Sequence, residues 1–162
     1  MCYREACLFL LVGTPAFATP VEVERNPTSA TCPVTISGEP FTQPSSPPRN
    51  RFWYGTEGLA VLLNRSGTWQ GMGMKRNYRD KLFWWRQGYV GATEQRPELI
   101  VSGRMLDGNA PPANASRATN AYHKDFGGWA MLVMVEFPSS GCWEVTGQYR
   151  GQTANFVVYV GP

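Results

Sequence analysis

The stretch from residue 129 to residue 160 restricts the possible folds of this chain more than any other. It reads WAMLVMVEFPSSGCWEVTGQYRGQTANFVVYV, and turn residues divide it into three apolar segments. The segment 129–137 is apolar at nearly every position, whereas 143–149 and 153–160 place apolar residues at every second position. A period of two is typical of β-strands that bury one face, and a run that is apolar throughout is typical of a strand covered on both faces. The stretch therefore predicts three consecutive β-strands.

The rest of the chain repeats this pattern of short apolar runs and turns. Glycine (17 residues) and proline (13 residues) are abundant, and charged residues make up only 17% of the chain, a composition that favours a turn-rich β protein. We expect about eight or nine short strands and no amphipathic helix. The fold class is predicted to be all-β, an immunoglobulin-like β-sandwich with a small β-barrel as the alternative. The further strands are expected at 59–63, 68–72, 81–86 and 97–105, with 59–63 and 68–72 forming a hairpin and 108–120 forming a polar loop.

The N-terminus resembles a secretory leader. Residues 6–12 are a short apolar core that follows Arg4, and Ala16-Phe17-Ala18 supplies a small-x-small cleavage pattern. The alternative is a buried N-terminal strand or helix. We expect a signal peptide at 1–18, a proline-rich strap or linker at 19–50, a β-sandwich domain at 51–162, and export to the periplasm or the extracellular space. No other apolar run is long enough to span a bilayer.

Cleavage after Ala18 would leave two cysteines, Cys32 and Cys142. In an exported chain this pair predicts one disulfide, and the alternative is a buried pair of free thiols. Because Cys142 directly precedes Trp143 in a predicted strand, the two side chains should point to opposite faces of the sheet. The disulfide should then tie the strap to the outside of the sheet. Two distant cysteines and the single His123 have no metal-ligand spacing, so we expect neither a metal nor a cofactor.

Four segments carry a resemblance to a known family: KLFWWRQGY, PELIVSGRMLDG, GGWAMLVMVEFP and GCWEVTGQYRGQTANFVVYV. They are similar to an uncharacterised family of exported bacterial proteins that end in a Phe-Pro, Gly-Cys-Trp-Glu, Thr-Gly hairpin. The resemblance covers about 52–160. It implies an extracytoplasmic β-sandwich and implies no activity and no site residue.

Catalytic patterns are weak in this sequence, so we expect no catalytic residue. A Ser-His-Asp site would need His123 with Asp80, Asp107 or Asp125, and no Gly-x-Ser-x-Gly context is present. The alternative function is accordingly a small secreted hydrolase that uses His123. A glycosidase would need a pair of carboxylates. Glu94, Glu98 and Asp80 are the acidic residues that lie near the predicted aromatic strands.

The charge pattern argues against nucleic acid as a partner. The net charge is only +3 and the basic residues are scattered, whereas nucleic-acid binding needs a basic patch or stripe.

The aromatic residues of the middle strands offer a better candidate surface. Trp84 and Trp85 are neighbours on a predicted strand and must point to opposite faces. One ring is then either exposed or covered by a loop, and an exposed ring could stack on a sugar or anchor a protein. The candidate binding residues are Trp84, Trp85, Arg86, Tyr89 and His123. The sequence thus predicts a non-enzymatic exported module that binds a protein or polysaccharide of the cell envelope or extracellular space, or alternatively a structural module without a ligand. It predicts no oligomeric state.

Overall fold

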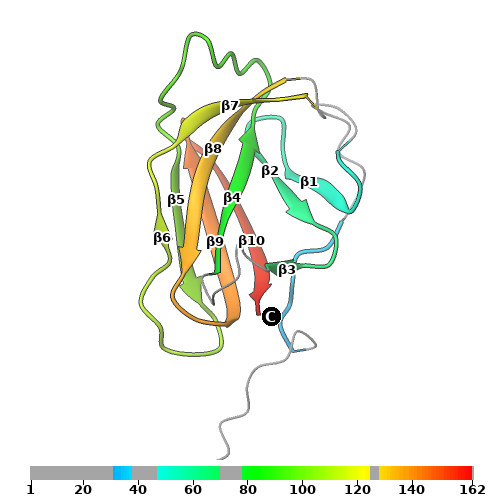
Figure 1. Cartoon of the computed structure of the whole chain (residues 1–162), viewed down its shortest axis with the longest axis vertical. Coiled ribbons are helices and arrows are strands. Elements are labelled where there is room, and N and C mark those ends of the chain that lie inside the picture. Colours follow the sequence, from blue (N-terminus) through cyan, green and yellow to red (C-terminus); the bar gives the residue numbers. More distant parts are fainter. Residues whose placement is uncertain (1–30, 38–46, 70–77, 125–127, 162) are drawn as a thin grey trace, which may run out of the picture.

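Two β-sheets pack face to face in the computed structural model, which describes residues 31–37, 47–69, 78–124 and 128–161 (Figure 1). The described part contains strands and no α-helix, which confirms the all-β sandwich. Its assignment as immunoglobulin-like stays a prediction. The first sheet has the order β1-β2-β4-β8-β6, with β7 also paired to β8, and the second has the order β3-β10-β9-β5. The strands of the first sheet are β1 (Arg51–Gly55), β2 (Ala60–Asn64), β4 (Tyr78–Trp85), β6 (Asn114–Ala115), β7 (Thr119–His123) and β8 (Gly128–Phe137). Those of the second are β3 (Thr68–Trp69), β5 (Ile100–Met105), β9 (Gly141–Tyr149) and β10 (Gln152–Val160).

The three strands expected at the C-terminus are confirmed as β8, β9 and β10. The strands β9 and β10 form an antiparallel hairpin from Gln152↔Tyr149 to Val160↔Gly141. Its turn residues, Arg150 and Gly151, both have positive φ (47° and 78°), as the tight turns that match strand twist require. β8 belongs to the other sheet, so the chain crosses the sandwich between Phe137 and Gly141.

The core lies between the sheets and is built on large rings. Trp84 of the first sheet and Trp143, Tyr149 and Phe156 of the second are all fully buried. The ring centroids of Trp84 and Phe156 are 5.9 Å apart. Gly147 of β9 leaves room for Trp84, because a Cβ at that position would lie 2.2 Å from Cη2 of the indole. The alternating pattern of β9 is confirmed, and its buried face is the one that meets the first sheet.

The hairpin expected from 59–63 and 68–72 is wrong. β2 pairs with β1 and β4 in the first sheet, whereas β3 pairs in parallel with β10 in the second. The intervening turn is present, with Gly67 at φ 67° donating its N–H to the carbonyl of Asn64. The turn therefore carries the chain across the sandwich instead of folding it back. Residues 70–72 lie outside the described residues.

The segment expected to be a polar loop at 108–120 contains strand structure. β6 pairs with β8 through Asn114↔Glu136, and β7 pairs with β8 from Thr119↔Leu132 to His123↔Gly128. His123 is consequently the last residue of a strand and not a loop residue. Polar residues can form strands here because the ladder hydrogen bonds join the backbone of β6 and β7 to that of β8 and do not depend on the side chains.

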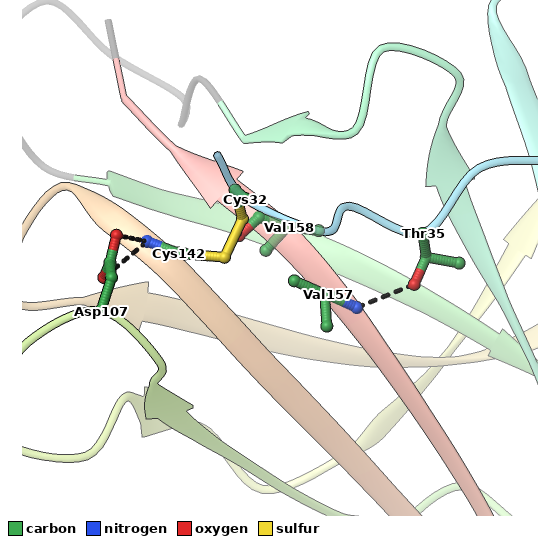
Figure 2. The surroundings of a disulfide bond; sticks show 6 residues. All are labelled: Cys32, Thr35, Asp107, Cys142, Val157 and Val158. Atoms are coloured by element: carbon green, nitrogen blue, oxygen red, sulfur yellow. Dashed lines mark hydrogen bonds between the residues drawn. A yellow bond between two sulfur atoms is a disulfide. The ribbon is translucent and has the colours of Figure 1, made fainter. Parts of the chain in front are cut away.

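The predicted disulfide between Cys32 and Cys142 is confirmed, with Cα atoms 5.5 Å apart and 110 residues between the two positions along the chain (Figure 2). As expected, it lies on the face of β9 opposite to Trp143. Thr35 forms two hydrogen bonds with Val157 of β10, one from its N–H and one to its Oγ1, each 2.9 Å long. Residues 31–37, which belong to the strap expected at 19–50, therefore run beside β10 as an extended segment without strand structure.

The expected signal peptide at 1–18 lies outside the described residues. Within the ranges that the structure does describe, no helix has the length and apolar character needed to cross a membrane.

Candidate functional site

Neither Trp84 nor Trp85 offers an exposed ring. Trp84 is fully buried between the sheets, and Trp85 is only 8% exposed. Trp85 lies on the outer face of the first sheet in a second apolar cluster with Trp53 and Leu62. The two rings do point to opposite faces, as the sequence predicts, and both are covered. The idea that one of them forms an open stacking surface is therefore not supported by the structure.

Arg86 and Tyr89 belong to a polar cluster at the end of the sandwich where β4 ends and β9 turns into β10. Oη of Tyr149 donates to the carboxylate of Glu94 at 2.7 Å, and Nη2 of Arg150 lies 3.1 Å from Oε2 of the same group. Oη of Tyr89 donates to the backbone carbonyl of Glu94 at 2.9 Å. The guanidiniums of Arg86 and Arg150 lie 5.7 and 5.3 Å from the ring centre of Tyr149. These contacts hold the loop that follows β4 against the β9–β10 turn.

Burial and the neighbouring carboxylate favour the protonated form of both tyrosines. Burial, followed by the negative charge of Glu94, raises the pKa of Tyr89 from 10.0 to about 12. Burial also raises the pKa of Tyr149, and its hydrogen bond to Glu94 acts in the same direction. Because Glu94 is held by a tyrosine and an arginine, it serves as an anchor, and a glycosidase pair formed by Glu94 and Glu98 gains no support from this geometry.

His123 lies on the outer face of the first sheet. Its ring meets Phe83 edge to face, with centroids 5.1 Å apart. Asp107, one of its three potential partners, lies instead at the disulfide, where its two carboxylate oxygens accept the N–H of Cys142 at 3.0 and 2.9 Å (Figure 2). Asp80 accepts the N–H of the neighbouring Lys81 at 2.7 Å, and Asp125 lies outside the described residues. The structure therefore does not gather His123 and Asp107 into one site.

A groove of about 520 Å³ lies elsewhere, between the approach to β5 and the connection from β6 to β7. Ile100, the first residue of β5, is 65% exposed beside it, while Leu99 and Ala118 are buried and contribute to the main core. Arg96 and Arg117 are exposed and form no ion pair with any residue in the described ranges. The groove, named here the β5 groove, is lined by Arg96, Pro97, Glu98, Leu99, Ile100, Arg117 and Ala118.

The β5 groove is open because β5 is the last strand of the second sheet (Figure 1). β9 pairs with one side of β5, and on the other side the carbonyl of Gly103 accepts the N–H of Ala113 at 3.0 Å. In an antiparallel strand, residues two apart direct their backbone groups to the same side. Val101 therefore presents its N–H and C=O to the open side, and in the described part of the chain these groups meet no hydrogen-bonding partner.

The sequence did not indicate this groove. Its two rims are about 20 residues apart in the chain, and they meet only because β6 and β7 pair with β8 in the opposite sheet. Those two short strands were expected to be loop. The one local signal is Arg96-Pro97 just before an apolar strand, since proline is tolerated at the start or the open edge of a sheet.

Comparisons of the chain with protein-family models, with curated proteins and with solved structures found no match. The structure by itself defines the class: a two-sheet β-sandwich with one disulfide that joins an N-terminal strap to the second sheet. The resemblance to an exported bacterial family stays a prediction.

Proposed function

We propose that this protein is an exported, non-enzymatic binding module, and that it holds another protein of the cell envelope or extracellular space in the β5 groove. The observation that carries the proposal is the groove itself. Apolar side chains and two guanidiniums that form no ion pair within the described ranges line it, next to the open edge of β5. Exposed apolar surface with a polar rim is typical of sites that bind proteins.

Export is supported by the disulfide together with the leader-like N-terminus. Structural disulfides persist in oxidising compartments and are rare in the cytosol of most organisms. The bond between Cys32 and Cys142 joins the strap to β9, while Thr35 binds β10, so the bond has a structural role that would be lost in a reducing environment.

A protein partner is favoured over a polysaccharide by the groove lining. Sugar rings are commonly held by exposed aromatic faces that stack on them. The described residues that line the β5 groove include no aromatic ring, and Trp84 and Trp85 are covered. The two tryptophans that suggested a stacking surface are instead used in packing, so they no longer argue for a carbohydrate ligand.

Site-specific photo-crosslinking in the exporting cell tests the proposal. Benzoylphenylalanine is placed at Ile100 in one variant and at Ile36 in a matched control. The control residue has the same chemistry and nearly the same exposure (68% against 65%), and it lies at the opposite edge of the second sheet. We expect an adduct of defined mass at position 100 that is absent at position 36 and weakened by Arg117→Glu. Equal labelling at both positions, or none at position 100, would refute the proposal and favour a structural module without a ligand.

A further inference from the structure

We propose that the occupant of the β5 groove is an extended segment of the partner, bearing carboxylate side chains, that adds to β5 as a further strand beside Leu99–Val101. This inference rests on the proposed function and specifies the chemistry of the partner and its mode of binding.

The backbone of β5 is prepared for such an addition. The open side of β5 is already used once, where Ala113 donates to Gly103. Two residues earlier Val101 presents the next N–H and C=O on the same side, and within the described ranges neither group has a backbone partner there. A row of unpaired backbone groups at a sheet edge is a template for another strand, and strand addition is a recurrent mode of peptide recognition. The groove thus continues a ladder that the protein itself leaves incomplete.

The side chains beside this edge suit a strand with alternating character. Successive side chains of an added strand point to opposite faces. On one face the exposed Ile100 offers an apolar contact. On the other, Pro97 and Leu99 form one wall and Ala118 forms the facing wall. An extended segment with an apolar residue at every second position would cover Ile100 or fill the space between these two walls.

The charge of the β5 groove indicates which sign of charge the other side chains of the partner segment should carry. Two guanidiniums, of Arg96 and Arg117, and one carboxylate, of Glu98, line the groove, so one positive charge is left over. Neither arginine is paired within the described ranges. The whole chain also carries a positive net charge of +3. Charge complementarity of this kind accelerates association and excludes partners of the wrong sign, so the groove should accept acidic segments and reject basic ones.

The test uses the full exported protein with its disulfide intact and three capped synthetic octapeptides. The first alternates Glu and Val, the second alternates Lys and Val, and the third is the Glu-Val peptide with backbone N-methyl groups on every second residue. Fluorescence polarisation gives the affinities, and amide NMR follows the hydrogen exchange of Val101. We expect the Glu-Val peptide to bind, to slow exchange at Val101, and to bind at least about tenfold more tightly than the Lys-Val peptide.

Charge variants and the modified peptide separate the parts of the proposal. Arg117→Glu should weaken binding of the Glu-Val peptide about tenfold, because it replaces an attraction by a repulsion. Arg65→Glu makes the same change of net charge at the exposed turn after β2, so the affinity should stay within about twofold. N-methylation removes the donors that face β5, and binding should be lost.

Each contrary result has a distinct meaning. Equal binding of the N-methylated peptide would overturn strand addition, and equal binding of the Lys-Val peptide would overturn the preference for acidic segments. An adduct at position 100 in either case would leave the proposed function standing. Protection of Val101 without any peptide, together with a dimer in solution, would show that a second copy of the chain occupies the edge and would overturn the proposed partner. No adduct and no peptide binding would refute both proposals.

Discussion

Replacing Gly147 by alanine tests how closely the two sheets pack. The added methyl carbon would lie 2.2 Å from Cη2 and 2.3 Å from Cζ3 of Trp84. Carbon atoms in contact normally lie about 3.5–4.0 Å apart. Either the indole or the backbone of β9 must then move by more than about 1 Å to restore an ordinary contact. Gly147 does not have positive φ, so backbone strain adds nothing and the effect isolates packing.

The loss in free energy of unfolding should lie at the upper end of the range that is typical of overpacked cores. Extra methyl groups in a well-packed core typically cost about 1–3 kcal/mol. Trp84 is fully buried and its ring contacts Phe156 in the opposite sheet, so the indole has little room to move. We expect Gly147→Ala to lower the free energy of unfolding by about 3 kcal/mol, which lowers Tm by about 10 °C in a domain of this size.

Urea unfolding followed by tryptophan fluorescence measures this change, with Gly58→Ala as the control. The three atoms nearest to a Cβ on Gly58 would all belong to the side chain of Gln152, with Oε1 at 2.7 Å, and a flexible side chain can move away. The control should change stability by less than about 0.5 kcal/mol. Trp84→Phe shortens the ring that overlaps the new methyl, so Gly147→Ala should cost less in that background. A loss below about 1 kcal/mol in the single variant, or strict additivity in the double variant, would refute the packing argument.

Two further predictions concern the disulfide and the tyrosine cluster. The double substitution Cys32→Ala and Cys142→Ala should lower the free energy of unfolding by about 5 kcal/mol, since the bond closes a loop across 110 positions. Urea unfolding measures this loss, and a value below about 1 kcal/mol would contradict the expectation. Because the pKa of Tyr89 is raised from 10.0 to about 12, its contribution to stability is fully present below pH 10 and is lost as the pH rises to about 12. Tyr89→Phe should make the loss of stability across that window shallower, and an unchanged slope by urea unfolding at a series of pH values would show that other groups cause it.

The C-terminal strands and the disulfide could be predicted because their signals are local. In β9 the alternation of Trp143 and Val145 with polar residues fixes which face is buried. Once that face is known, the position of Cys142 follows from its place next to Trp143. The pairing with Cys32 then needed only the count of cysteines that remain after an expected cleavage.

The crossing after β2 and the β5 groove could not be predicted, because both depend on contacts far apart in the sequence. The turn that ends at Gly67 is equally compatible with a hairpin and with a crossing to the other sheet. The choice depends on β10, about 90 residues later, which pairs with β3. Likewise Arg117 meets the approach to β5 only because β6 and β7 pair with β8. No periodicity within Asn114–Ala115 signals a strand.

The strap has a consequence for the order in which the molecule is completed. A chain that enters an oxidising compartment N-terminus first delivers Cys32 long before Cys142, 110 positions later. The bond can therefore form only after every strand from β1 to β8, and the first two residues of β9, have emerged. Until then the strap has no covalent hold, and the stretch of β10 around Val157 that it later covers is synthesised after Cys142. Oxidation thus comes late in assembly, and a cell that is slow to oxidise this protein would accumulate a sandwich in which the strap has no covalent attachment to the second sheet.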